Sequence, residues 1–578
     1  MKIKDFLIHQ SQSLEEKYNS PTKILRLLII ILLFLNFILL GIDGLNRAFD
    51  PEGWDTTGFL GDANFIKHQE GVTNFLSLCI TGKYEQANQH PLYILLLTPF
   101  ASTDISFFII AKIISAVIGS ILILILFIVG KRMFGDLVAS VAVFALLLNA
   151  VFIEWTTLVA CESLLMLLYL LSIYFIIEGF KNNKYWAYAG IFAGLSYLTK
   201  ASGLFLLPGF ALSSIIIYKL KIFKNKFFWL FFILFTAVTS PLLIRNIVVY
   251  QNPFFNDNLY LVTMEWDKVV SSRYLTFDLK EGAINWNFDN SETKDQSEIK
   301  SENHQKNSTF NLFNLPGKFI KGGEVFLNTL NISWAQKIPS KWLKRIFTLF
   351  LFILFIIGIA REKKLGAKIY FIITLLVFFL LLSFNPIDRY FLPIIPFIWI
   401  YIALGIFTIL DLINKKLSLK YLKLNIISYI PHVLILSLIL YAGFILTKKT
   451  FANPMNSVEY SESRLDLLNW LRSNLQEDDK YTLGPNFNWQ LEKGTWILPP
   501  DDAKTKDFSK FKTFIKRHDV SYVIIERSSL KDKMKLIENN FVLDPIEGVI
   551  EKKSVDGWEL VYRDRNKPVD FLVYKLIK

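Results

Sequence analysis

The chain has 578 residues, of which 53% are hydrophobic and only 20% are charged, and its mean hydropathy is +0.38. This composition excludes a disordered chain, a collagen-like chain and a soluble protein of several domains, and a content of 2 cysteines excludes a disulfide scaffold. The remaining class is a polytopic α-helical membrane protein. In such a protein, the meaning of the net charge of +13 depends on which loops carry the Lys and Arg residues.

Stretches of mainly apolar residues recur along the chain at the length of about 20 residues that a helix needs to cross a bilayer. They predict about eleven transmembrane helices, at residues 24–42, 105–129, 136–153, 161–178, 185–199, 203–218, 227–247, 344–360, 367–384, 390–411 and 426–446. The first stretch is long and has no small-residue cleavage site after it, so we do not expect a cleavable signal peptide.

The distribution of Lys and Arg predicts the orientation of these helices. With a cytoplasmic N-terminus, the cytoplasmic pieces are 1–26, 130–136, 178–184, 219–226, 361–368 and 411–424. They hold 21 basic and 7 acidic residues, whereas the rest of the chain holds 42 and 43. The positive charge is therefore a topology signal, and no nucleic-acid partner is expected. We expect a membrane domain at 1–446, with outer loops at 43–104 and 248–343.

The tail, residues 447–578, is predicted to be a small extracytoplasmic α/β domain. Residues 462–475 have helical apolar spacing, and a second helix is expected near 505–518. The apolar runs at 521–526 and 571–577 predict two buried strands. We expect the protein to be integral to the cell membrane. Because the predicted number of membrane helices is odd and the N-terminus is expected in the cytoplasm, the tail is expected on the extracytoplasmic side.

The first outer loop contains the clearest candidate for a catalytic carboxylate. Asp62 begins a stretch with helical apolar spacing, which predicts a helix along the membrane surface. An Asp at the start of a helix commonly caps that helix. At a membrane surface, partial desolvation also suits such a group to act as a general base. Both interpretations stay open at this point, and Glu70 is a second candidate.

Other polar residues occur where apolar segments begin or end. His90 and Tyr93 precede an apolar run too short to span, where they are either interfacial anchors or part of a substrate site. Lys200 lies between two hydrophobic runs. Its side chain either extends to the membrane–water interface or is part of a functional site. Glu162, at the outer end of the helix predicted at 161–178, either caps that helix or faces the same site.

Two arginines at predicted outer helix ends depart from the positive-inside tendency. Arg245-Asn246 ends the span at 227–247, and Asp388-Arg389-Tyr390 opens the span at 390–411. Local charge pairing is one explanation, and phosphate binding by the planar guanidinium group is the other. A carboxylate with several cations at the outer leaflet suits chemistry on a membrane-borne phosphate donor, although a transporter also collects such residues.

At this point the chain resembles the integral-membrane glycosyltransferases of the GT-C group, which use polyprenyl-phosphate sugars. More narrowly, it resembles the branch of protein mannosyltransferases and lipid A aminoarabinose transferases. The resemblance extends from the first helix to about residue 412. It is carried by Gly61-Asp62 with Phe65, Thr81-Gly82-Lys83-Tyr84, His90-Pro91-Leu92-Tyr93, Cys161-Glu162-Ser163, Leu198-Thr199-Lys200, Arg245-Asn246 and Arg389-Tyr390.

The resemblance implies an inverting glycosyltransferase. Asp62 would activate an acceptor hydroxyl, and Lys200, Arg245 and Arg389 would stabilise the departing polyprenyl phosphate. Many members of the group have two adjacent acids, but Ala63 follows Asp62 here, which argues against a metal-bridged acid pair. No cofactor is expected, and a divalent metal is not indicated.

The partners implied are a polyprenyl-phosphate sugar donor, a lipid, glycan or protein acceptor, and the membrane. The main alternative is a polytopic transporter or flippase of lipid-linked sugars, although no internal repeat of the kind found in transporters is evident. A metal-dependent phosphoethanolamine-type transferase is disfavoured because His518 is the only histidine after residue 447. A sensor or assembly protein is a third alternative.

Overall fold

The computed structural model describes residues 54–84, 86, 89–256, 273–278, 283–288, 323–327, 329–330, 341–382, 388–416, 462–482, 487–498, 508–526, 554–555, 558–563 and 571–577, with scattered positions between 31 and 51. The chain forms two compact units. The first comprises residues 1–49, 111–240 and 313–456, and the second comprises 50–110, 241–312 and 457–578.

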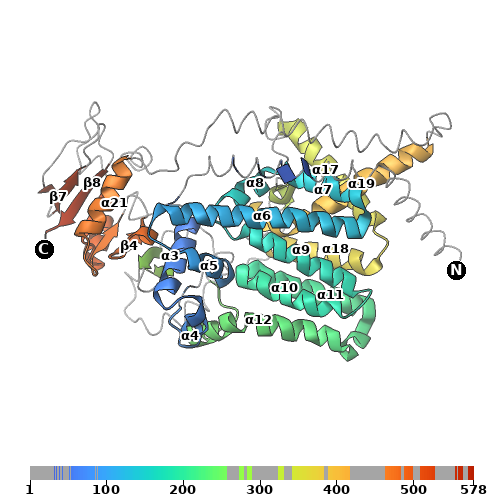
Figure 1. Ribbon diagram of the computed structural model, residues 1–578, viewed down its shortest axis with the longest axis horizontal. Coiled ribbons are helices and arrows are strands. Elements are labelled where there is room, and N and C mark those ends of the chain that lie inside the picture. The colour runs from blue at the N-terminus through green and yellow to red at the C-terminus, as the bar shows by residue number, and fades with distance from the viewer. Residues whose placement is uncertain are drawn as a thin grey trace. The chain divides into compact units, whose positions relative to one another are not determined.

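The first unit is a bundle of apolar helices (Figure 1). Its helices, two of which extend into the second unit, are α6 (Ile105–Phe134), α7 (Asp136–Leu147), α8 (Ala150–Thr157), α9 (Glu162–Gly179), α10 (Tyr185–Thr199), α11 (Leu206–Tyr218), α12 (Lys226–Tyr250), α17 (Lys341–Arg361), α18 (Leu365–Leu382) and α19 (Ile395–Lys416). Three short 3-10 segments join them: η3 (Ala201–Phe205), η4 (Lys219–Lys224) and η7 (Asp388–Ile394). Helix α10 packs along α9, and α11 packs along α18.

Glycines let helices of this bundle approach closely. A Cβ atom on Gly358 of α17 would collide with the backbone carbonyl of Tyr401 on α19, and one on Gly405 would collide with that of Leu354. Gly179 at the end of α9 likewise leaves room for the buried indole ring of Trp186 on α10. Small residues at such contacts are typical of helix packing in membranes, where dispersion contacts provide much of the association energy.

The predicted membrane helices are confirmed in part. Among the described residues, five helical segments are long and apolar enough to cross a membrane: Ile105–Phe134, Glu162–Gly179, Ala201–Lys224, Lys226–Tyr250 and Arg389–Leu412. The stretch 136–153, predicted to be one span, is instead divided between α7 and α8, because the side chain of Asn149 accepts a hydrogen bond from the backbone N–H of Phe152 and starts a new helix.

The span at 426–446 lies outside the described residues, as does most of the span at 24–42. The count of about eleven helices and the cytoplasmic N-terminus therefore stay predictions.

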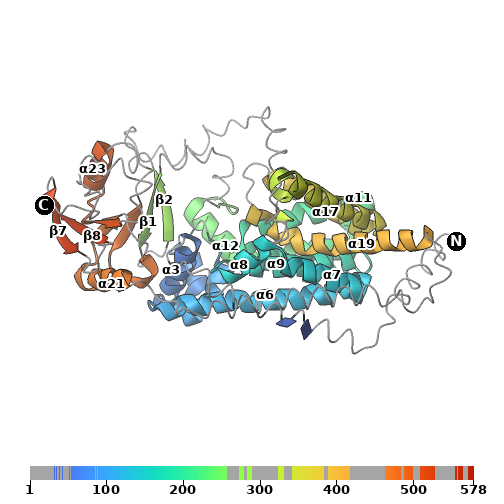
Figure 2. The ribbon, with the colours of Figure 1, turned by 90° about the horizontal axis from the view of Figure 1, so that it is seen from above.

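The second unit contains an eight-stranded mixed sheet (Figure 2). Its strands are β1 (Arg273–Asp278), β2 (Ala283–Phe288), β3 (Lys480–Thr482), β4 (Thr495–Leu498), β5 (Tyr522–Glu526), β6 (Ser554–Val555), β7 (Trp558–Arg563) and β8 (Phe571–Leu576), in the order β2-β1-β4-β3-β5-β8-β7-β6. Strand β3 pairs in parallel with β4 and β5, and the other pairs are antiparallel. Helices α21 (Glu462–Asn474) and α23 (Phe508–Arg517) lie on opposite sides of the sheet.

All four elements predicted in the tail are confirmed, as α21, α23, β5 and β8. The sheet contains more than the tail, however. Strands β1 and β2 come from the outer loop predicted at 248–343, and β1 pairs with β4 of the tail from Leu275 opposite Leu498 to Phe277 opposite Trp496. The tail and this loop therefore share one sheet, while the domain boundary at 447 stays a prediction.

The first outer loop folds into short helices that also belong to the second unit. They are α3 (Trp54–His68), η1 (Val72–Asn74), α4 (Phe75–Ile80), α5 (Pro91–Leu97) and η2 (Thr98–Phe100). A short segment of the tail, η8 (Asn488–Gln490), packs on α3. Asn64 Nδ2 donates to the carbonyl oxygen of Trp489 at 2.8 Å, and the Trp489 indole donates to the carbonyl oxygen of Pro51 at 2.9 Å. The tail thus holds the helix that carries Asp62.

Candidate functional site

Asp62 lies in the middle of α3, not at its start. The helix begins eight residues earlier, at Trp54, because apolar and small residues extend the helical pattern back along the loop. The cap interpretation of Asp62 is therefore wrong. The side chain is fully buried, with an exposed fraction of 0%. Because a buried carboxylate needs polar partners, its surroundings decide what it can do.

Gln86 and Arg245 surround Asp62. Gln86 Nε2 donates to Asp62 Oδ2 at 2.6 Å, and the guanidinium group of Arg245 donates through Nη1 to the backbone carbonyl of Gln86. Arg245 also lies over two aromatic rings, 5.6 Å from the ring centroid of Tyr84 and 5.5 Å from that of Tyr250. The carboxylate, amide, cation and two phenols form what we call the Asp62 cluster.

Three polar atoms of the Asp62 cluster are buried and have no hydrogen-bond partner within the described part of the chain. They are Asp62 Oδ1, Arg245 Nε and the hydroxyl oxygen of Tyr84. Buried polar atoms are normally hydrogen-bonded, so three unpaired atoms in one place make this cluster the candidate site. One carboxylate oxygen of Asp62 accepts the hydrogen bond from Gln86, and the other has no partner among the described residues.

Burial raises the pKa of Asp62 well above its ordinary value of 3.8, although the Gln86 hydrogen bond and the charge of Arg245 oppose this effect. Burial also raises the pKa of the Tyr84 phenol, and the neighbouring Asp62 adds to that shift. A carboxyl group with a raised pKa is a stronger base once it is ionised, as proton abstraction from a hydroxyl requires.

Two other predicted residues of the first loop are buried near the start of α5. His90 precedes the helix, and its Nε2 lies 2.9 Å from Asn256 Nδ2. Tyr93 is fully buried, with its ring edge-on to Phe59 at a centroid distance of 4.9 Å. Both residues pack the loop together. Glu70 is exposed and follows α3 with a φ of 70°. It takes no part in the hydrogen bonds that join Asp62, Gln86 and Arg245.

Asn246 is buried next to Arg245 but holds a turn. Its Nδ2 donates to the carbonyl oxygen of Pro253 at 2.8 Å and to that of Phe255 at 3.1 Å. These bonds fix the chain where it leaves α12, and thereby support the position of Arg245.

A second cluster, in the first unit, joins Glu162 and Lys200. Glu162 is the first residue of α9 and is buried, with an exposed fraction of 2%. Lys200 follows the end of α10, and its Nζ lies 2.7 Å from Glu162 Oε1. We call this the Glu162–Lys200 pair. Because the two charged groups are close together and Glu162 is buried, the pair fixes the start of α9 against the end of α10.

Tyr390 and Arg389, in η7, lie beside the Glu162–Lys200 pair. Lys200 Nζ is 5.1 Å from the centroid of the Tyr390 ring. The guanidinium carbon of Arg389 lies 4.9 Å from the Trp155 ring and 5.6 Å from the Tyr390 ring, and its charge acts on Glu162. The side chain of Asp388 lies outside the described residues.

The structure thus divides the predicted site residues between two clusters. Arg245 lies with Asp62, whereas Lys200 and Arg389 lie with Glu162 and Tyr390. Sequence reasoning missed Gln86, Tyr250 and Trp155. Gln86 comes shortly after the motif Thr81-Gly82-Lys83-Tyr84. No local pattern showed that its amide would contact a carboxylate 24 residues away.

Comparison with known proteins supports the sequence-based resemblance. Residues 100–244 match the family model described as dolichyl-phosphate-mannose-protein mannosyltransferase. The fold is similar to that of the oligosaccharyltransferase of Archaeoglobus fulgidus in its apo form, with a TM-score of 0.53 at 14% identity over 90% of this chain and 73% of that chain. No curated protein sequence matches the chain.

Two further solved structures are similar. For the same archaeal enzyme, AglB, in complex with an inhibitory peptide and a dolichol-phosphate, the TM-score is 0.52 at 12% identity over 87% of this chain and 70% of that chain. ArnT from Cupriavidus metallidurans bound to undecaprenyl phosphate gives a TM-score of 0.47 at 12% identity over 95% of this chain and 97% of that chain. The family match and the archaeal fold together confirm the resemblance to GT-C glycosyltransferases.

Proposed function

We propose that this protein is a membrane glycosyltransferase that moves a sugar from a polyprenyl-phosphate donor to a hydroxyl group of an acceptor. The family match at residues 100–244 and the fold shared with a glycosyltransferase support the reaction class. The observation that carries the proposal is the Asp62 cluster, in which a buried carboxylate has one oxygen fixed by Gln86 and the other, Oδ1, without a partner among the described residues.

In the proposed reaction, Asp62 Oδ1 accepts the proton of the acceptor hydroxyl. The hydroxyl oxygen attacks the anomeric carbon of the sugar while the bond from that carbon to the phosphate oxygen breaks. The bonding electrons leave with the polyprenyl phosphate, and the single displacement inverts the anomeric configuration. Arg245, whose Nε is buried and unpaired among the described residues, is suited to stabilise negative charge that develops beside Asp62.

Several parts of the proposal rest on the sequence. Binding of the donor phosphate by Lys200 and Arg389 stays a prediction, as does the extracytoplasmic position of the site. The Glu162–Lys200 pair would hold the ammonium group in place while leaving it partly exposed, since its side chain is 21% accessible.

The reaction class can be tested in cells that lack the protein. Mass spectrometry of the glycans, glycoproteins and lipid A of a deletion strain is expected to show one glycoconjugate that has lost a sugar, and the wild-type protein should restore it. Unchanged glycoconjugates, together with flux of a labelled lipid-linked sugar in proteoliposomes, would contradict the proposal and favour a transporter.

The raised pKa of Asp62 predicts how transfer depends on pH. Since the base must be ionised, the rate should rise with pH through an apparent pKa well above 3.8. The free energy of unfolding should change in the opposite direction. The contribution of Asp62 to it is fully present below pH 3.8, the ordinary pKa of the group, and is lost as pH rises through the raised pKa, because the buried carboxyl group then ionises. Rate and thermal unfolding measured across pH would check both trends. A rate already at its plateau near pH 4 would exclude Asp62 as the base.

A further inference from the structure

The two ends of α9 carry different charged groups. Glu162 begins the helix, and Glu178 lies 16 residues later, about 24 Å away along the axis at the usual rise of 1.5 Å per residue. The end at Glu178 is the end that the distribution of Lys and Arg assigns to the cytoplasm, and it has no part in the proposed transfer reaction.

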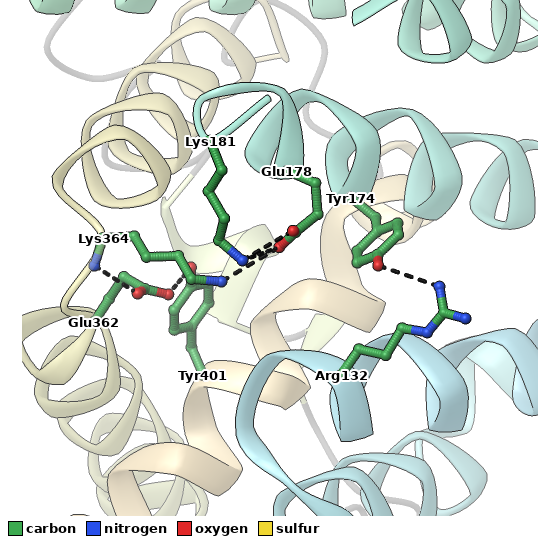
Figure 3. Close-up of polar contacts among 7 residues, drawn as sticks. All are labelled: Arg132, Tyr174, Glu178, Lys181, Glu362, Lys364 and Tyr401. Carbon is green, nitrogen blue, oxygen red and sulfur yellow. Dashed lines mark hydrogen bonds and ion pairs between the residues drawn. The ribbon is translucent and has the colours of Figure 1, made fainter. Parts of the chain in front are cut away.

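One carboxylate at this end contacts two lysines that come from different loops (Figure 3). Lys181 Nζ lies 2.8 Å from Glu178 Oε1, and Lys364 Nζ lies 3.3 Å from the same oxygen. The side chains of both lysines remain accessible, at 51% and 33%. A single negative charge shared by two ammonium groups leaves a local excess of positive charge.

The nearby carboxylates are already engaged within the fold. Glu362 is buried and accepts hydrogen bonds from the Tyr401 hydroxyl at 3.4 Å and from the backbone N–H of Lys364 at 2.9 Å. Asp136 Oδ1 lies 2.9 Å from Lys131 Nζ. By contrast, Arg132 is exposed and donates to an uncharged partner, the hydroxyl of Tyr174, at 3.5 Å.

Some of these groups line a cavity of about 410 Å³. Its charged lining comprises five basic residues, Arg132, Lys181, Arg361, Lys363 and Lys364, and three acidic residues, Asp136, Glu362 and Asp411. Its apolar wall is made by Leu137 and Val138 of α7 and by Leu404 and Phe407 of α19. The cavity therefore combines a cationic part with an apolar surface between two helices of the bundle.

Two further features favour an anion in this cavity. Burial lowers the pKa of Lys363, and the positive charge of Arg361 lowers it further, so these two cations are close enough to repel each other. The first turn of α7 also lines the cavity. Gly135, at its N-cap with a φ of 93°, provides no side chain to satisfy the leading N–H groups, and the acidic residue of that turn, Asp136, already pairs with Lys131. Helix N-termini and adjacent cations are the usual surroundings of a bound phosphate.

We propose that this cavity binds the phosphate headgroup of a membrane lipid, with the phosphate against Arg361, Lys363 and Lys364 and the start of the lipid chains against α7 and α19. The apolar wall favours a lipid over free phosphate, and the position at the ends of α6, α9 and α17 places the headgroup at the bundle end. The cavity shares no residue with the Asp62 cluster or with the Glu162–Lys200 pair, so its test does not depend on the transfer reaction.

The test measures lipid binding to the purified full-length protein by native mass spectrometry, with phosphatidic acid as the probe and phosphatidylcholine as the zwitterionic comparison. In the double variant Arg361→Gln, Lys363→Gln, the affinity for phosphatidic acid should fall at least about ten-fold, because charge-assisted hydrogen bonds are lost. The charge-preserving variant Arg361→Lys, Lys363→Arg should keep most of the binding, which distinguishes lost contacts from a damaged fold.

The matched control removes two charges from another loop of the same unit. Lys221 and Lys224, in η4, are exposed, and neither lines the cavity. The variant Lys221→Gln, Lys224→Gln should bind phosphatidic acid as the wild type does. Equal weakening in both glutamine variants, or none in either, would overturn the proposal, because binding would then reflect only the general positive charge. Competition by inorganic phosphate would show that the phosphate group alone is recognised, and its absence would show that the lipid chains are needed as well.

Discussion

The substitution Asp62→Asn is expected to reduce sugar transfer by about 10²–10⁴-fold, the usual contribution of a general base. Asparagine has nearly the same shape and keeps an oxygen for the hydrogen bond from Gln86, so the variant should insert and fold like the wild type. What it loses is the ability of the second carboxylate oxygen to accept a proton. The measurement is the initial rate of transfer from a polyprenyl-phosphate sugar in proteoliposomes, normalised to the amount of inserted protein.

Glu70 provides the matched control for this substitution. Glu70→Gln makes the same change of charge in the same loop, eight residues further on, at an exposed position. Its transfer rate should stay within about two-fold of the wild type, because exposed side chains away from a site contribute little. If Asp62→Asn kept full activity, or if both variants lost activity equally, Asp62 would have no role as the base.

Removing the cation of the Glu162–Lys200 pair is expected to have the largest effect on stability. Lys200→Met leaves the carboxylate of Glu162, which is 2% accessible, without its partner at 2.7 Å. Breaking a buried pair in this way costs up to roughly 3–5 kcal/mol, since the remaining charge is desolvated and keeps only the opposite charge of Arg389 nearby. The double variant Glu162→Gln, Lys200→Met should recover much of this loss. The measurement is the free energy of unfolding in detergent.

Lys181 allows a comparison at the other end of α9. Lys181→Met removes an ion pair of similar length, 2.8 Å, but its side chain is 51% accessible and Glu178 keeps its contact with Lys364. Its cost should therefore be no more than about 1 kcal/mol, as for other exposed pairs. Equal costs for Lys200→Met and Lys181→Met would mean that burial does not decide the strength of the Glu162–Lys200 pair.

The sequence was sufficient to predict most of the local structure. Runs of apolar residues predicted α6, α9, α10, α11, α12, α17, α18 and α19, and apolar spacing in the tail predicted α21, α23, β5 and β8. These predictions succeed because the period of hydrophobic residues reflects which side of an element is buried, and that is a local property. This kind of prediction fails where a polar side chain ends one helix and starts the next, as Asn149 does between α7 and α8.

The candidate site was predictable as a set of residue types but not as an arrangement. Asp62, Arg245, Glu162 and Lys200 stood out because charged groups near apolar segments are costly. Their partners did not stand out. Gln86 meets Asp62 across 24 residues, and Lys200 meets Glu162 across 38. Such pairs depend on how loops and helix ends pack, which no local pattern specifies.

By itself, then, the sequence determined that the protein is a bundle of apolar helices with an α/β tail, since hydrophobic burial and periodicity act along the chain. Only the tertiary structure decided that Asp62 lies in the middle of a buried helix, that strands from an outer loop complete the sheet of the tail, and that Glu162 neutralises Lys200. The physical reason is that hydrogen bonds and ion pairs require contact between particular atoms, and those contacts form only when distant segments pack together.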